Sequence, residues 1–196
     1  ITISSTNPLI TANNNYYFSA TYTETMQGDA LANFAVNMKK DSAATVKVEN
    51  DDTTTATIKR FTNRMKKLTE NNQSVVGNFT LSTQNTDYTD VIEQIRDSGA
   101  RTVFLSVSAK TAKEFLTQAT DNNLTHVLFL GTREWNDEDF LKFVRENGKL
   151  NVAYPTEQSQ NAETALSKTF LAAYKEKYGG DAEPSERTAV AFDAYM

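Results

Sequence analysis

Short apolar runs alternate with segments of helical periodicity through the middle of the chain. Between the runs, apolar residues recur at i, i+3, i+4 and i+7, as in Tyr88, Val91, Ile92 and Ile95, which is the pattern of one buried helix face. Strands that are apolar on both faces and alternate with helices predict a parallel sheet covered by helices on both sides. We therefore expect an α/β fold, a three-layer, Rossmann-like parallel five-stranded sheet, with strands at residues 45–49, 74–79, 102–105, 126–131 and 150–154.

Two further amphipathic segments, residues 26–40 and 162–178, lie outside this alternation and need something to pack on. We predict that they belong to a second, incomplete domain. The expected division is a partial first lobe at 1–40, a complete second α/β lobe at 41–158, and a further part of the first lobe at 159–196. The chain begins without Met and stops inside a helical pattern, so we expect a fragment.

Composition narrows the possible functions. Hydrophobic residues make up 39% and charged residues 23% of the 196 positions, which fits a folded globular protein. The net charge of -5 argues against nucleic acid as a partner, because phosphate binding requires clustered Lys and Arg. With no cysteine, disulfides and thiolate metal sites are excluded.

The sequence does not predict an enzyme. The single histidine, His126, lies in an apolar run without a nucleophile elbow, and the seven glycines form no phosphate-binding motif. Asp51 and Asp52 follow a strand, but the third strand ends in Ser106 where phospho-acceptor chemistry needs an Asp. We therefore expect a turn or helix cap at Asp51, and no catalytic residue, metal or cofactor.

Small hydroxylated residues follow several of the predicted strands. Hydroxyls can donate and accept hydrogen bonds, so such positions suit a small polar ligand. They also suit ordinary turns, and spacing does not decide between the two. These positions are Ser4, Ser5, Thr6, residues 53–55, Ser106 and Ser108.

The order of the segments resembles the type I periplasmic binding protein family, in the branched-chain amino-acid-binding branch that serves ABC transporters. Residues 1–11 are similar to a strand and ligand-binding turn of that family, and residues 17–28 to the next segment. Residues 131–135 resemble its glycine–tryptophan loop, and residues 174–179 and 191–194 its closing helices. The resemblance implies two lobes that are joined by three crossovers and close on a ligand.

The resemblance also implies a ligand site. Ser4, Ser5 and Thr6 match the turn that holds the ligand carboxylate, and Glu24 matches a position that could meet an ammonium group. The remaining candidates are Thr53, Thr54, Ser108, Arg133, Glu134 and Trp135.

Three of these candidates depart from the family pattern. Thr53 or Thr54, and Ser108, replace common aromatic residues, and Arg133 stands where an acidic residue would bind ammonium. An arginine there would favour a carboxylate. Alternatively, Arg133 turns to solvent and Glu134 takes the acidic role.

The function expected from the resemblance is the extracytoplasmic solute-binding component of an ABC transporter. It would bind an amino acid or similar small polar solute between two lobes and deliver it to a membrane permease. The location would be the periplasm, or the cell surface for a lipoprotein. The alternative is the ligand-binding sensor domain of a receptor with the same fold.

Overall fold

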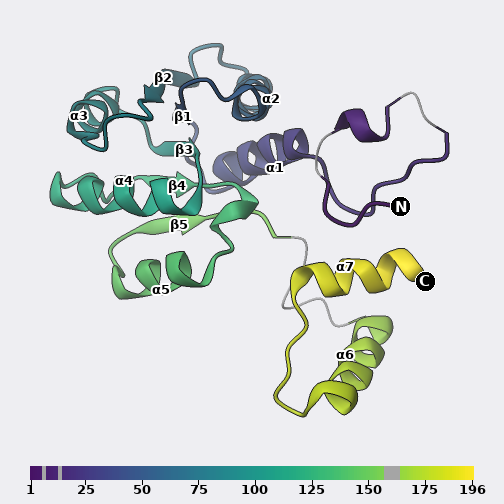
Figure 1. Cartoon of the computed structure of the whole chain (residues 1–196). Helices are drawn as coiled ribbons and strands as arrows, with labels where there is room; N and C mark the ends of the chain where they lie inside the picture. The colour runs from purple at the N-terminus through teal and green to yellow at the C-terminus, as the bar shows by residue number, and fades with distance from the viewer. Residues whose placement is uncertain (6–7, 13–14, 157–163) are drawn as a thin grey trace. The chain divides into compact units, whose positions relative to one another are not determined.

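The computed structural model describes residues 1–5, 8–12, 15–156 and 164–196, with only the backbone of Pro8, Asp52 and Thr53. The chain forms two compact units (Figure 1). Unit 1 combines Ile1–Glu24 with Thr156–Met196, and unit 2 is Thr25–Pro155. None of the described helices is long and apolar enough to cross a membrane.

Unit 2 is built on a five-stranded sheet in which every strand pair is parallel. The order β2-β1-β3-β4-β5 confirms the predicted five-stranded α/β fold. The chain passes from β1 to β2 on one side and then to β3 on the other side of β1, so the direction of winding reverses between β1 and β3. Sheets of this kind bind ligands at the carboxyl edge at such a point. The strands are β1 (Ala43–Val48), β2 (Val75–Leu81), β3 (Thr102–Ser106), β4 (Leu128–Leu130) and β5 (Asn151–Ala153).

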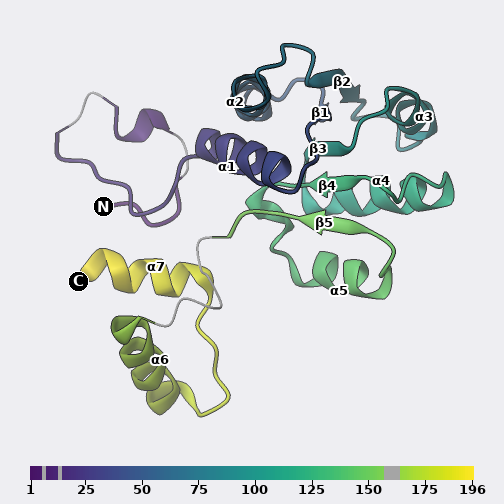
Figure 2. The same ribbon diagram turned by 180° about the vertical axis from the view of Figure 1, so that it is seen from behind.

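Helices cover both faces of this sheet, as Figures 1 and 2 show from opposite sides. On one face, α1 (Glu24–Asn37) and α2 (Asp52–Thr69) bury Leu31, Phe61 and Met65 against Phe104 and Leu130. On the other face lie α3 (Thr89–Asp97), α4 (Ala109–Asp121) and α5 (Glu138–Glu146), whose buried side chains include Ile92, Phe115 and Phe140. The sheet therefore lies between two separate apolar cores.

The position of α1 differs from the expected division of the chain at residue 40. Its residues from Thr25 onward belong to unit 2, because α1 packs directly on α2. The approach is close at Gly28, where a Cβ atom would lie 2.5 Å from the carbonyl oxygen of Thr57. Only glycine allows this contact, so the boundary between the units lies near residue 24.

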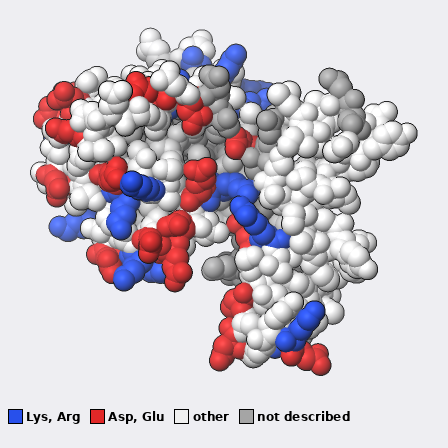
Figure 3. Space-filling view, in the orientation of Figure 1, with Lys and Arg blue, Asp and Glu red and all other residues white. Residues whose placement is uncertain are grey.

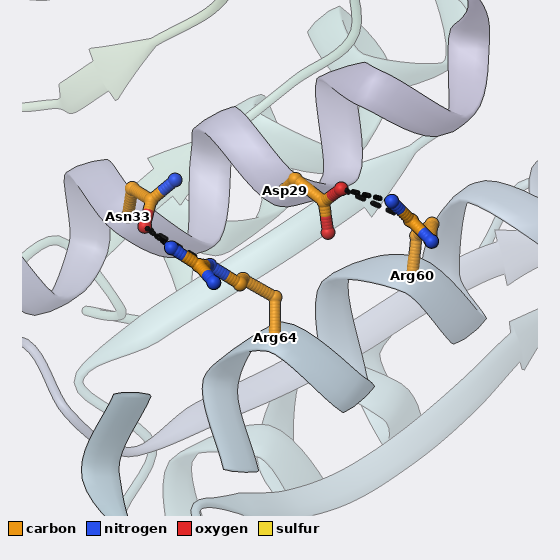
Figure 4. A network of polar contacts seen from close by, with 4 residues as sticks. All are labelled: Asp29, Asn33, Arg60 and Arg64. Atoms are coloured by element: carbon orange, nitrogen blue, oxygen red, sulfur yellow. Dashed lines mark hydrogen bonds and ion pairs between the residues drawn. The ribbon is translucent and has the colours of Figure 1, made fainter. Parts of the chain in front are cut away.

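Two arginines of α2 hold α1 in place (Figure 4). Arg60 donates from Nε and Nη2 to Asp29 Oδ2, at 3.0 and 2.6 Å. One turn later, Arg64 donates in the same way to Asn33 Oδ1, at 3.1 and 2.8 Å. Both pairs repeat with a spacing of four residues, so the polar contacts run along one side of the two helices.

The described residues of unit 1 form helices and a single isolated strand bridge. Near the N-terminus, Thr2 forms a parallel bridge with Ser19, and a 3-10 helix covers Pro8–Ile10. In the C-terminal part, α6 (Ala165–Tyr178) and α7 (Glu186–Tyr195) meet through Phe170 and Phe192, whose ring centroids lie 4.6 Å apart. No residue of α6 is fully buried.

Candidate functional site

The loops after β1, β3 and β4 leave the same edge of the unit 2 sheet, because the three strands are parallel neighbours. This edge brings together four of the predicted ligand residues: Thr54, Ser108, Arg133 and Glu134. The side chain of Thr53 and the whole of Thr6 lie outside the described part of the chain. Sequence spacing could suggest this grouping only through the assumption of a parallel sheet.

The loop after β1 is organised by Asp51. Its side chain caps α2 by accepting a hydrogen bond from the Thr54 amide at 3.0 Å, which confirms the expected helix cap. The hydroxyls of Thr54 and Thr55 both donate to the Asp51 carbonyl oxygen, at 3.1 and 2.9 Å. The Thr54 hydroxyl therefore keeps its lone pairs available as acceptors, whereas the Thr55 hydroxyl accepts from Lys47 Nζ at 2.8 Å.

The loop after β3 presents Ser108 at the start of α4. Ser108 Oγ accepts a hydrogen bond from the Thr111 amide at 3.3 Å and shares another with Thr111 Oγ1 at 3.1 Å. Ser108 is exposed. It therefore caps a helix and could still hydrogen-bond a ligand through its remaining lone pair.

Trp135 packs under the loop after β4, against the interior of unit 2, and holds the loop in place. The indole is fully buried, donates from Nε1 to the Val107 carbonyl oxygen at 3.1 Å and packs on Phe140. Gly131 faces the ring so closely that an added Cβ would lie 1.9 Å from it. Trp135 thus supports the loop, and its ring offers no exposed face to a ligand.

Arg133 is fixed by a residue that the sequence did not single out. Its amide donates to Gln27 Oε1 of α1 at 2.9 Å, and Gln27 is itself buried. Arg133 is half-buried, whereas Glu134 is exposed. Gln27 lies within residues 17–28, one of the segments that carry the resemblance noted from the sequence, but the residue it contacts is 106 positions further along the chain.

A second group of polar residues lies in one row at this edge, and of its members the sequence had indicated Ser106 but neither Lys47 nor Thr132. Lys47 on β1 pairs with Ser106 on β3. Phe104 on β3 pairs with Leu130 on β4, and Ser106 and Thr132 are the residues two positions after this pair. The backbone stays extended at Thr132. Lys47, Ser106 and Thr132 therefore share the face that α1 and α2 cover. The available signal was a lysine inside an otherwise apolar strand.

One carboxylate oxygen of Glu49, at this edge, already accepts three hydrogen bonds. Glu49 Oε1 accepts hydrogen bonds from the Thr83 amide at 2.8 Å, the Thr83 hydroxyl at 2.9 Å and the Ser82 hydroxyl at 3.1 Å. These contacts, led by the Thr83 amide, lower the pKa of Glu49. Glu49 thus ties the loop after β2 to the end of β1.

The remaining predicted residues belong to unit 1. Ser4 is exposed and Ser5 half-buried, with the Ser5 amide donating to Thr2 Oγ1 at 3.1 Å. Glu24 begins α1 and is half-buried.

The described residues contain no group of three or more His, Asp or Glu arranged to hold a metal ion. Over the visible face of unit 2, Lys and Arg are interspersed with Asp and Glu (Figure 3).

Comparison with known proteins identifies the family. A profile described as "Periplasmic binding protein" matches residues 1–196. The chain belongs to the periplasmic binding protein family. This assignment confirms the resemblance noted from the sequence, and the members of the family are solute-binding proteins, not enzymes. No curated protein matches the chain.

Solved periplasmic binding proteins have the same fold. A leucine binding protein from Thermotoga maritima superposes with a TM-score of 0.77 at 20% identity, over 99% of this chain and 54% of that one. A branched-chain amino acid transporter substrate binding protein from Streptococcus pneumoniae, in complex with isoleucine, gives 0.75 at 21% identity, over 98% and 53%.

A third solved structure, a solute binding protein from R. palustris in complex with 4-hydroxybenzoate, gives a TM-score of 0.68 at 19% identity, over 92% of this chain and 48% of that one. This chain spans about half the length of these three proteins.

Proposed function

We propose that the chain is part of an extracytoplasmic solute-binding component of an ABC transporter. The observation that carries the proposal is the family match over all 196 residues. Solved proteins of the same fold contain isoleucine or 4-hydroxybenzoate, so we propose that this protein also binds a small carboxylate-bearing solute. An ABC permease in the membrane would receive it, and the protein would act in the periplasm or as a cell-surface lipoprotein.

The binding site of the proposal combines residues of both units. Ser4, Ser5, Thr6 and Glu24 would contribute from unit 1 by the family resemblance. Thr53, Thr54, Ser108, Arg133 and Glu134 would contribute from the carboxyl edge of unit 2, with Trp135 holding the β4 loop in shape. Hydroxyls and one guanidinium suit hydrogen bonding to a polar solute, and binding would favour a closed arrangement of the lobes.

A thermal-shift screen tests this function. The protein, produced at its full natural length, is heated with leucine, isoleucine, benzoate, 4-hydroxybenzoate or glutarate, each at several concentrations. A bound solute at one hundred times its Kd stabilises the native state by about 2.7 kcal/mol, which corresponds to a rise in Tm of about 5 to 10 °C. The Tm should rise with the concentration of at least one solute. Unchanged Tm values across the panel would refute the proposal.

A further inference from the structure

Lys47 is an unusual cation for a central parallel strand. β1 is otherwise apolar apart from Thr45, which hydrogen-bonds Asn78 Oδ1 at 2.7 Å. Lys47 Nζ donates to Thr55 Oγ1 in the first turn of α2, at 2.8 Å. No described carboxylate forms an ion pair with it. The ammonium is therefore held at the carboxyl edge by a neutral hydroxyl.

The surroundings of Lys47 favour an anion. The N-terminus of a helix carries partial positive charge, and the 18-residue helix α2 begins beside the Lys47 ammonium. A lysine and a helix N-terminus repel each other unless a negative group lies between them. Asp51 caps the same helix end, where its Oδ1 accepts from the Thr54 amide, but no described hydrogen bond or ion pair joins it to Lys47, whose ammonium therefore lacks a directly bound anion.

Two buried hydroxyls in the same row lack hydrogen-bond partners. Ser106 is 1% exposed, and neither Ser106 Oγ nor Thr132 Oγ1 has a partner among the described residues. An unsatisfied buried hydroxyl costs about 1–3 kcal/mol. The two hydroxyls lie at the end of β3 and just after β4. They are next to the point between β1 and β3 where the winding of the sheet reverses, and such sheets bind ligands there.

We propose that the row of Lys47, Ser106 and Thr132, together with Arg133, receives a carboxylate of the solute. This inference rests on the proposed function and narrows it. The solute presents an acid group to unit 2, as a dicarboxylate or an aromatic acid can, and does not present the ammonium of a branched-chain amino acid. A carboxylate would pair with the ammonium, accept from the two hydroxyls and complement the N-terminus of α2.

Titration calorimetry with glutarate, benzoate and leucine tests the proposal on the longest native form of the protein. At least one of the two acids should bind about tenfold more tightly than leucine. Lys47→Met should then weaken that acid by about 10- to 100-fold, because a charge-assisted hydrogen bond is lost, and Lys47→Arg should recover part of the affinity.

The matched control is Lys67→Met, which removes the same charge from the last turn of α2 and should leave the affinity unchanged. Circular dichroism checks that each variant folds. Ser106→Ala separates binding from stability, since deleting an unpartnered hydroxyl should preserve or raise the Tm of the free protein while weakening the acid by about 3- to 10-fold.

Two results would overturn the inference and leave the proposed function intact. One is tighter binding of leucine than of either acid, and the other is an acid affinity that Lys47→Met does not change. If none of the three compounds binds and the thermal-shift screen is also negative, the proposed function fails and this inference with it.

Discussion

Replacing Gly131 by alanine tests how the loop after β4 is held against the sheet. The added methyl group would lie 1.9 Å from Cδ2 of Trp135, far inside van der Waals contact, and the indole is fully buried. Either the backbone at 131 or the indole must shift. Overpacking of this kind costs about 1–3 kcal/mol, and loss of the Nε1 hydrogen bond to Val107 would add about 1 kcal/mol.

We therefore expect Gly131→Ala to lower the free energy of unfolding by about 2–4 kcal/mol and the Tm by about 5–15 °C. The assay is urea unfolding followed by both fluorescence and circular dichroism. Trp135 is the single tryptophan of the chain, so its emission reports directly on this loop and should shift to longer wavelength in the folded variant.

Gly148→Ala is the matched control, because an added Cβ at Gly148 would meet no atom within 4 Å. It should change the free energy of unfolding by less than about 0.5 kcal/mol. If Gly131→Ala behaved like this control, with the emission maximum also unchanged, the packing of Trp135 under the loop would be refuted.

Two other features give quantitative expectations. Arg64→Met should destabilise unit 2 by about 1–2 kcal/mol because Asn33 then loses a charged partner in a half-buried contact. Arg60→Met should cost under about 1 kcal/mol because the Arg60 side chain is 57% exposed. Equal losses of the two variants in chemical denaturation would contradict this ranking. The lowered pKa of Glu49 means that its contacts stabilise the fold at neutral pH and lose that contribution as pH falls through the lowered value. Wild type should therefore have a higher Tm than Glu49→Gln at pH 7, and this difference in Tm should close below about pH 4.5, the ordinary pKa of a glutamate. A difference in Tm that widens in acid would contradict the direction of the pKa shift.

The sheet could be predicted from the sequence because its strands are buried on both faces. Every residue of β3 and β4 is buried, so these strands appear as uninterrupted apolar runs. The buried face of α1 was harder to predict. Periodicity selects Leu31, Phe34, Ala35 and Met38. Leu31 and Ala35 are buried, whereas Phe34 and Met38 are 40% and 54% exposed and Ala32 is fully buried instead. Small residues let α1 approach α2 closely, and a pattern based on large apolar side chains gives them too little weight.

The candidate site depends on long-range geometry that local sequence does not specify. Trp135 follows Arg133 and Glu134 in one short segment, but its ring turns under the loop because Gly131 leaves space for it. Lys47, Ser106 and Thr132 form a row only because β1, β3 and β4 are neighbours. The sequence predicts five strands and helices between them, whereas strand order follows from how the whole sheet packs.

The central claim is that the protein binds a solute. The most direct test is a calorimetric titration of the protein at its full natural length with the solute that gives the largest rise in Tm. We predict saturable binding of one solute per chain, with a negative heat-capacity change because apolar surface is buried on binding. Saturable binding should also protect the loop after β4 from hydrogen exchange. A titration that gives no saturable heat at solute concentrations up to the millimolar range would contradict the assignment of this chain to solute binding.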